Sequence, residues 1–334
     1  MNESTPRKFK GSLLERAAER RAFGVPGEIA PVEKPQARVK PAEPDSVATA
    51  NPEETPAPIP TEREAPAQRK PEPVREATSR TAPARSASGR RMVTVDRDLL
   101  ARKGMLVPGA PVSALAEEMR LVKRQLLITA NTVAAADAQR ARMILVGSAK
   151  PDDGKTFCAI NLAVSMAAEQ DVEILLVDAD FAKPDILATL GVEEGPGLLD
   201  ALGDPAIDVE ALICDTDVPN LSILPAGTKS DSDTELLASG RARAILDRLA
   251  AANPRRVVIF DSPPALAASS ASVLAMHVGQ IMLVVRADST SESELREAVQ
   301  MLDRCDHIQL VLNGVTFTPG GKRFGSYYDQ ESRK

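Results

Sequence analysis

Apolar and polar residues follow two alternating patterns from about residue 105 to residue 318, and together they predict a layered α/β domain. Short runs that are apolar almost throughout are typical of strands in a parallel sheet covered on both faces. The stretches between them repeat apolar residues at the spacing of one helix face. The expected strands are 142–148, 173–180, 221–227, 256–264, 279–287 and 308–315, and the expected helices are 111–131, 155–169, 233–252, 265–277 and 291–304.

Strands that alternate with helices imply parallel crossover connections. The sequence therefore predicts an α/β fold with a doubly wound, mostly parallel sheet of the P-loop NTPase type. In such folds a ligand binds at the carboxyl ends of the strands, so the residues that follow the strands are the first candidates for chemistry.

The N-terminal part of the chain has a different composition. Residues 24–90 are rich in Pro, Ala, Glu, Arg, Ser and Thr and contain few large apolar residues. Such a segment cannot bury enough surface to offset the entropy lost on ordering, so we predict a disordered, partly polyproline-like linker. Residues 12–23, SLLERAAERRAF, predict a short helix that is either transient or a docking helix for a partner or membrane surface. The expected organisation is a mostly disordered region 1–91, a P-loop domain 92–318 and a C-terminal tail 319–334.

The composition of the chain bears on its binding partners and on its cellular compartment. The net charge is -6, from 41 Lys and Arg against 47 Asp and Glu, and this argues against non-specific nucleic-acid binding. The chain contains no run of about 18 apolar residues and no signal peptide after its N-terminus. Its three cysteines, Cys158, Cys214 and Cys305, lack metal-ligand spacing and are expected to be reduced thiols. We therefore expect a cytoplasmic protein with no nucleic-acid partner.

The stretch SAKPDDGKTF at 148–157 lies between an expected strand and an expected helix, where backbone N–H groups favour a phosphate. Gly154 lets the backbone approach the phosphates, Lys155 can reach the β- and γ-phosphate oxygens, and Thr156 can ligate Mg²⁺. The pattern departs from the usual one, because Ala149 replaces its first glycine and Pro151 lies inside the loop. The expected nucleotide contacts are Ala149, Pro151, Asp152, Asp153, Gly154, Lys155, Thr156, Phe157 and Asn313.

Two further expected strands end in carboxylates, Asp178 with Asp180 on one and Asp261 on the other. A buried strand rarely ends in an unpaired acid, because a buried charge is costly unless it is paired or bound to metal. The expected metal ligands are therefore Thr156, Asp178 and Asp261, and the expected catalytic residues are Lys155, Asp178 and Asp180. These residues predict nucleotide binding but do not decide between hydrolysis and phosphoryl transfer.

The C-terminal tail contains the two tyrosines of the chain, Tyr327 and Tyr328. They are either tail aromatics without a role or phosphoacceptors presented to a neighbouring active site. Phosphorylation would add roughly -1.5 to -2 charges to each. That charge would be repelled by Asp329 and Glu331, which follow directly.

Taken together, these motifs resemble the bacterial tyrosine kinases of exopolysaccharide synthesis, the BY-kinase class. The chain is most similar to the soluble autokinases of exosortase and PEP-CTERM polysaccharide systems. The resemblance covers about 92–330 and is carried by AEEMRLVKRQLL, SAKPDDGKTFCAINLA, ILLVDADFAKPD, VVIFDSPP and GSYYD. It implies an ATP- and Mg²⁺-dependent tyrosine autokinase that phosphorylates Tyr327 and Tyr328 of a neighbouring subunit and thereby regulates polysaccharide polymerisation and export.

The resemblance also implies roles for particular residues. The proline-bearing loop matches the family's Walker A variant, Asp178 and Asp180 match its A′ motif, and Asp261 matches Walker B. The E-x-x-R-x-x-R helix, which contacts the next subunit of a ring in that family, corresponds to Glu117, Arg120 and Lys123.

The partners implied are a chain-length-determinant (polysaccharide co-polymerase) membrane protein as activator, further copies of the chain, and a tyrosine phosphatase. The activator would recruit the chain to the inner face of the cytoplasmic membrane. Two departures matter: Ala182 stands where the A′ motif has arginine, and Lys150 stands where MinD/ParA-type ATPases carry their signature lysine. The alternative is therefore a non-kinase MinD/ParA-like ATPase switch or scaffold in the same machinery.

Overall fold

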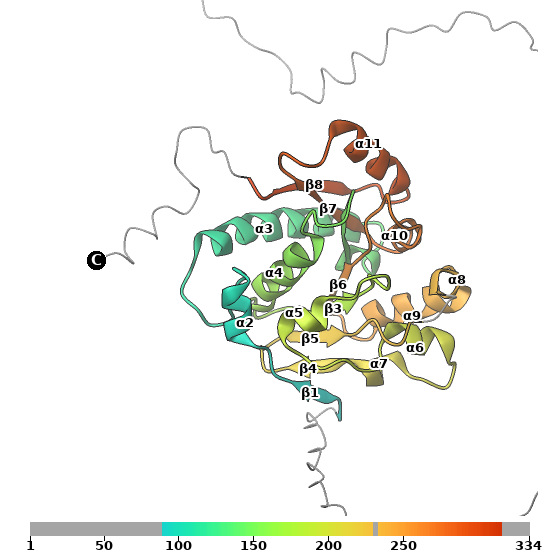
Figure 1. The fold of residues 1–334 in the computed structure, drawn as a ribbon. Coiled ribbons are helices and arrows are strands. Elements are labelled where there is room, and N and C mark those ends of the chain that lie inside the picture. The colour runs from blue at the N-terminus through green and yellow to red at the C-terminus, as the bar shows by residue number, and fades with distance from the viewer. Residues whose placement is uncertain (1–88, 230–232, 316–334) are drawn as a thin grey trace, which may run out of the picture. The chain divides into compact units, whose positions relative to one another are not determined.

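A computed structural model describes residues 89–229 and 233–315, and these form an eight-stranded sheet between two layers of helices (Figure 1). The predicted helix at 12–23, most of the linker 24–90, and both Tyr327 and Tyr328 lie outside the described residues. The strands are β1 (Arg91–Val93), β2 (Met143–Ser148), β3 (Glu173–Asp178), β4 (Cys214–Thr216), β5 (Leu221–Leu224), β6 (Arg256–Asp261), β7 (Gln280–Arg286) and β8 (Ile308–Asn313).

The strand order is β1-β4-β5-β3-β6-β2-β7-β8, and every neighbouring pair is parallel except β4 with β5. This confirms the predicted doubly wound, mostly parallel sheet. The chain leaves β2 for β3 and β5 on one side and later returns to β7 and β8 on the other. The reversal of direction places a crevice at the carboxyl ends of the central strands, beside β2, β3 and β6.

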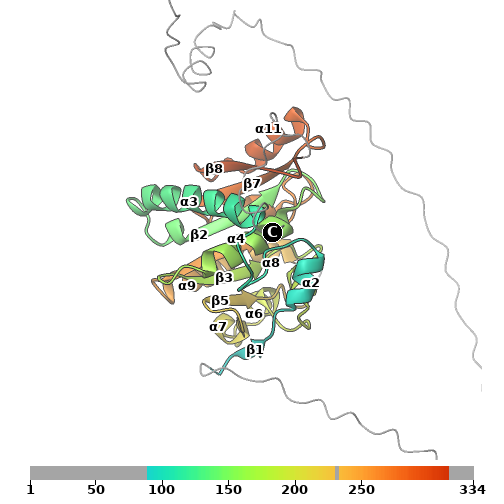
Figure 2. The same cartoon turned by 90° about the vertical axis from the view of Figure 1, so that its left-hand side faces the viewer.

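Two apolar clusters fill the space between the sheet and the helices on its two faces (Figure 2). One face is covered by α2 (Arg97–Arg102), α3 (Ala114–Ala134), α4 (Lys155–Ala167) and α5 (Ile186–Leu190). The other face is covered by α6 (Leu198–Gly203), α7 (Val209–Leu212), α8 (Asp233–Leu237), α9 (Gly240–Ala251), α10 (Ser270–Ala275) and α11 (Glu292–Met301). Burial on both faces explains why β2 and β6 are apolar throughout. None of the described helices is long and apolar enough to span a membrane.

The structure differs from the predicted elements in a few places. The helix expected at 233–252 is two helices, because α8 ends at Leu237 and Ser239 caps α9 by accepting a hydrogen bond of 3.1 Å from the Ala242 N–H. The strand expected at 173–180 ends at Asp178, so Asp180 lies in the following loop. The strand expected at 256–264 ends at Asp261. Strands β1 and β4, with three residues each, are too short to show a period in the sequence.

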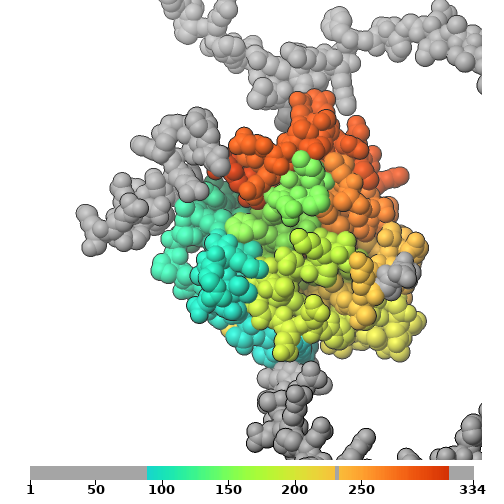
Figure 3. All heavy atoms as spheres, viewed as in Figure 1, coloured from blue at the N-terminus to red at the C-terminus, as the bar shows by residue number. Residues whose placement is uncertain are grey.

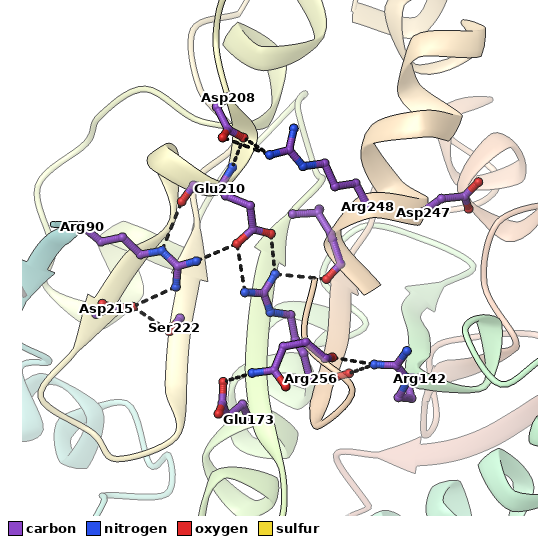
Figure 4. A network of polar contacts seen from close by, with 12 residues as sticks. Arg90, Arg142, Glu173, Asp208, Glu210, Asp215, Ser222, Asp247, Arg248 and Arg256 are labelled. Atoms are coloured by element: carbon purple, nitrogen blue, oxygen red, sulfur yellow. Dashed lines mark hydrogen bonds and ion pairs between the residues drawn. The ribbon is translucent and has the colours of Figure 1, made fainter. Parts of the chain in front are cut away.

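A buried ion cluster joins the far edge of the sheet to the helical layer (Figure 4). The Glu210 carboxylate of α7 accepts two hydrogen bonds from Arg256, the first residue of β6, at 2.6 and 3.0 Å. Its Oε2 also accepts a bond of 2.6 Å from Arg90, which precedes β1. Arg256 is only 7% exposed and also donates to the Leu249 carbonyl of α9 at 3.1 Å. One carboxylate therefore compensates two arginines and joins β1, β6, α7 and α9.

We expect Glu210→Gln to lower the free energy of unfolding by about 3 kcal/mol, because it leaves the buried Arg256 guanidinium without its counter-charge. Urea unfolding followed by circular dichroism measures this change. Glu292→Gln is the matched control, since its ion pair with Arg296 is exposed and is expected to contribute less than about 1 kcal/mol. Equal losses in the two variants would contradict this role for the cluster.

Candidate active site

The loop between β2 and α4 is held in shape by one buried carboxylate. Asp153 is 1% exposed, and its Oδ2 accepts a hydrogen bond of 3.0 Å from the backbone N–H of Lys150. Its Oδ1 accepts a bond of 3.0 Å from the hydroxyl of Thr290, between β7 and α11. Its backbone carbonyl accepts a bond of 2.9 Å from the side-chain amide of Asn313, the last residue of β8. Two segments far along the chain, at Thr290 and at Asn313, therefore fix the loop.

Gly154 is the residue that the loop conformation requires at the start of α4. Its φ of 94° lies in the left-handed region that side chains disfavour. A Cβ at this position would also collide with the Asn313 amide. No side chain caps the N-terminus of α4. Its first backbone N–H groups and the positive end of the helix dipole are therefore available to an anion.

Lys155, the first residue of α4, lies almost buried against the carboxylates of the neighbouring strand. Its Nζ is 2.8 Å from Asp180 Oδ2, and Asp180 Oδ1 accepts a hydrogen bond of 3.1 Å from the backbone N–H of Lys183. Burial alone would lower the pKa of Lys155, but the charges of Asp261 and Asp180 outweigh it, so the pKa is raised. The amine is therefore a permanent positive charge beside the start of α4.

Asp178 and Asp261 end adjacent strands and are direct partners in the sheet register. Asp178 accepts hydrogen bonds from the backbone N–H groups of Ile186 at 3.1 Å and Asp180 at 3.3 Å. Burial and the Asp261 charge nevertheless raise the pKa of Asp178 to about 7. Burial also raises the pKa of Asp261 to about 7, against the opposing charge of Lys155. Neither oxygen of Asp261 has a hydrogen-bond partner among the described residues.

The donor set fits a magnesium–nucleotide complex. Two buried oxygens without partners are an unusual cost, and a divalent cation is the natural compensation. Within residues 89–229 and 233–315, no three His, Cys, Asp or Glu side chains are arranged to hold a metal ion. Mg²⁺ is usually held by one or two carboxylates together with phosphate oxygens and water. An open hollow of about 250 Å³ at this point is lined by Asp152, Gly154, Lys155, Thr156, Phe157, Lys183 and Asp185.

The remaining residues predicted to contact nucleotide occupy different environments. Pro151 and Asp152 are exposed on the loop. In the space-filling view, the green part of the chain that contains the loop lies at the surface beside the orange, last part of the described chain (Figure 3). Ala149 is buried, and Phe157 packs partly into the apolar core. Asp153 and Asn313 bond to the loop and to each other rather than facing the hollow.

Two residues of the site were not expected from the sequence. The hydroxyl of Thr290 holds the loop, but its position 137 residues beyond Asp153 gives no local signal. Lys183 lines the hollow, with its Nζ 3.9 Å from Asp152 Oδ1. It follows Ala182, the position where the related motif carries arginine. A cation is therefore present at the mouth of the hollow one residue later than the motif predicts.

Lys150, the possible counterpart of a signature lysine, is bound within its own chain. Its Nζ donates to the Ser289 carbonyl at 3.0 Å and forms an ion pair with Glu294 of α11 at 3.1 Å. In this conformation its amine does not project freely towards another molecule.

The three residues of the predicted oligomerisation motif line one open hollow along α3 but differ in their exposure. Glu117 and Arg120 form an ion pair with each other on α3, and the Arg120 side chain is half exposed. Lys123 is buried instead, donating to the Ser165 carbonyl of α4 at 3.2 Å and pairing with Glu169. The structure therefore leaves Glu117 and Arg120 accessible and uses Lys123 to attach α3 to α4.

The fold, the loop and the strand-end carboxylates together define a P-loop nucleotide-binding domain. The sequence profile of the family described as AAA domain matches residues 141–313, just over half of the chain. The chain belongs to this family. Its relatives among curated proteins and solved structures include bacterial tyrosine kinases.

Two of these relatives are curated proteins. EpsB of Ralstonia nicotianae, whose name assigns it to the tyrosine-protein kinases, is 32% identical over 203 residues. These residues are 60% of this chain, and the chain spans only about a quarter (26%) of EpsB. The tyrosine-protein kinase YwqD of Bacillus subtilis is 27% identical over 215 residues, which cover 64% of this chain and 86% of YwqD.

Two solved structures of tyrosine kinase domains are also similar to the chain. The kinase domain of the Escherichia coli tyrosine kinase ETK superposes with a TM-score of 0.50 at 27% identity, covering 56% of this chain and 73% of that one. The BceF tyrosine kinase domain gives a TM-score of 0.50 at 26% identity, covering 58% and 76%.

We expect Thr290→Val to weaken ATP binding about tenfold or more, because it removes the hydroxyl that bonds the buried Asp153 carboxylate. Thr290→Ser keeps the hydroxyl and should bind ATP within about twofold of the unaltered chain. Calorimetric titration with Mg·ATP measures both. Equal affinities for the valine and serine variants would show that the hydroxyl does not position the loop.

The raised pKa of Asp261 predicts an unusual pH dependence of stability without ligand. The folded chain holds a proton that the unfolded chain has lost between about pH 4 and about pH 7, so this contribution falls as the pH rises through that window. Asp261→Asn should therefore show a flatter fall in unfolding free energy between pH 5 and pH 7.5. Urea unfolding at several pH values measures the difference, and parallel curves would refute it.

Proposed function

We propose that the chain is an ATP:protein-tyrosine phosphotransferase that phosphorylates its own C-terminal tyrosines. The observation that supports this most directly is the cluster of Lys155 with Asp178, Asp180 and Asp261 at the start of α4. The Lys155 amine and the uncapped N-terminus of α4 suit the phosphates of ATP. The buried carboxylates suit the metal ion that a kinase binds with ATP. Similarity to bacterial tyrosine kinases supports phosphotyrosine as the product.

Each residue of the cluster has a role in this proposal. The N–H groups at the start of α4 and the amine of Lys155 bind the β- and γ-phosphates, and Thr156 with Asp261 holds Mg²⁺. Bound Mg·ATP supplies a γ-phosphoryl group whose developing charge the metal neutralises. Asp178 accepts the tyrosine proton as the tyrosine oxygen bonds to the phosphorus and the bond to ADP breaks. A pKa of about 7 suits a carboxylate for that proton transfer near neutral pH.

Asp180 and Lys183 orient the phosphate-binding groups in this proposal. Asp180 bridges the Lys155 amine and the Lys183 backbone N–H. The Lys183 side chain at the mouth of the hollow supplies the positive charge that Ala182 cannot.

The acceptors in this proposal are Tyr327 and Tyr328 of a neighbouring copy. The described chain ends at Val315, two residues after Asn313, which itself bonds to the phosphate loop. The last described residues therefore lie close to the phosphate loop of the same copy. Transfer between copies would require assembly, and the accessible pair of Glu117 and Arg120 on α3 is the surface that we assign to it.

The wider role is proposed from the family resemblance. A chain-length-determinant membrane protein would activate the kinase and recruit it to the inner face of the cytoplasmic membrane. A tyrosine phosphatase would reverse the modification. Cycles of assembly and phosphorylation would then regulate exopolysaccharide polymerisation and export.

We expect phosphotyrosine at 327 or 328 after incubation of the full chain with Mg·ATP, measured by mass spectrometry. The incubation is run with and without the cytoplasmic segment of a chain-length-determinant membrane protein. Lys155→Ala should reduce the signal at least about a hundredfold, because the γ-phosphate loses its main cation. Replacing both tyrosines with Phe should abolish it, and Arg296→Gln, an exposed residue of α11, is the control.

The same experiment distinguishes the alternative of an ATP-dependent switch. ADP formation with both tyrosines unmodified, even with the activating segment, would indicate a MinD/ParA-like role rather than a kinase. In that case Lys150→Ala should abolish ATP-dependent association. The present contacts of Lys150 with Ser289 and Glu294 would then have to break on assembly.

A further inference from the structure

A second hollow, of about 320 Å³, lies between α9 and α10 on the face of the sheet opposite α3 and α4. The turn that forms its third side, Arg140–Arg142, precedes β2, whereas the phosphate loop follows β2. The two sites therefore lie at opposite ends of the same strand. The hollow is lined by Arg140, Ala238, Ser239, Gly240, Arg243, Asp247, Val273, Met276 and His277.

The hollow carries an excess of positive charge. Arg140 donates to the carbonyls of Met276 and Val278, both at 2.9 Å, while its Nε is buried without a partner among the described residues. Arg243 is 76% exposed and approaches the one acid of the hollow, Asp247, only to 3.9 Å. A buried donor without a partner calls for an acceptor, and two guanidinium groups favour a charged one.

His277 lines the hollow among these charged groups. Burial lowers the pKa of His277, the charge of Asp247 on α9 raises it, and the charges of Arg243 on α9 and Arg140 before β2 each lower it. A bound anion would reverse that effect, because it would favour the imidazolium form.

The N-terminus of α9 adds a second element suited to an anion. The helix has 12 residues, and Ser239 bonds its third N–H, of Ala242, leaving the first turn directed at the hollow. Gly240 has no side chain to cover these groups, and the space beside its Cα is open. Val273 and Met276, at α10, form an apolar wall of the hollow.

We propose that this hollow binds a phosphate monoester on an aromatic ring, with phosphotyrosine as the ligand. The phosphate would lie among Arg140, Arg243, His277 and the start of α9, and the ring would lie against Val273 and Met276. Arginine clusters beside apolar walls suit this chemistry, since planar guanidinium groups bind phosphate in pairs of hydrogen bonds. That the phosphotyrosine comes from the chain's own tail rests on the proposed function. The proposal that the hollow binds phosphotyrosine does not. The fit suggests that a phosphorylated tail is retained after transfer.

The test is a titration of the full chain with phosphotyrosine, observed by NMR at the imidazole C–H groups. The chain contains two histidines, His277 and His307, so one signal reports the hollow and the other is an internal control. We expect saturable shifts at His277 alone, a higher pKa for His277 at saturation, and weaker binding of inorganic phosphate, which lacks the ring. Unphosphorylated tyrosine should cause no shift.

Arg243→Gln should weaken phosphotyrosine binding at least about tenfold without risk to the fold, because the side chain is exposed. Arg248→Gln, on the same helix but paired with Asp208, should leave it unchanged. An unmoved His277 signal, or equal binding by both variants, would overturn the proposal. Because the ligand is added, the result does not depend on whether the chain is a kinase. A chain that binds phosphotyrosine but forms none would refute the proposed function alone.

Discussion

Uncompensated negative charge at the carboxyl edge of the sheet is the constraint on which the active site depends. Asp178 and Asp261 end neighbouring strands side by side, with Asp180 directly after, and Lys155 is the one cation buried among them within the described chain. The apolar strands on either side exclude water, so the charges cannot be screened. The result is carboxyl pKa values near 7 and oxygens of Asp261 without partners. A site built in this way is incomplete until a cation and a polyanion enter together.

The phosphate loop must keep an open conformation beside these charged side chains. Its shape is set from outside, by Thr290 and Asn313 acting through Asp153. Both residues belong to the last part of the described chain, the part that leads into the tail. Movement of Asn313 at the end of β8 would therefore displace the loop at Gly154, where no side chain could fit. These contacts couple the conformation of the loop to the end of β8.

The sequence predicted the fold class and the central strands because burial on both faces makes them apolar throughout. It also predicted the loop with Lys155 and the strand-end acids, because their order along the chain fixes their place at the sheet edge. It could not predict that Lys123 turns inward to Glu169, since a lysine at helical spacing looks the same on either face. Nor could it predict Thr290, whose partner is 137 residues away. The short strands β1 and β4 were missed because their positions depend on long-range contacts such as Arg90 with Glu210.

The charge distribution of the domain follows the direction of its strands. At the carboxyl ends, acids gather around one lysine and suit a metal-bound triphosphate. Before β2, at the opposite end of that strand, Arg140 and Arg243 face one aspartate and suit an anion without metal. A triphosphate with its metal and a phosphate monoester without one would thus find different environments in the same domain. If the tail carries its phosphate from the first environment to the second, the product would be removed from the site that made it, because the metal-free phosphate is attracted where the cations are in excess.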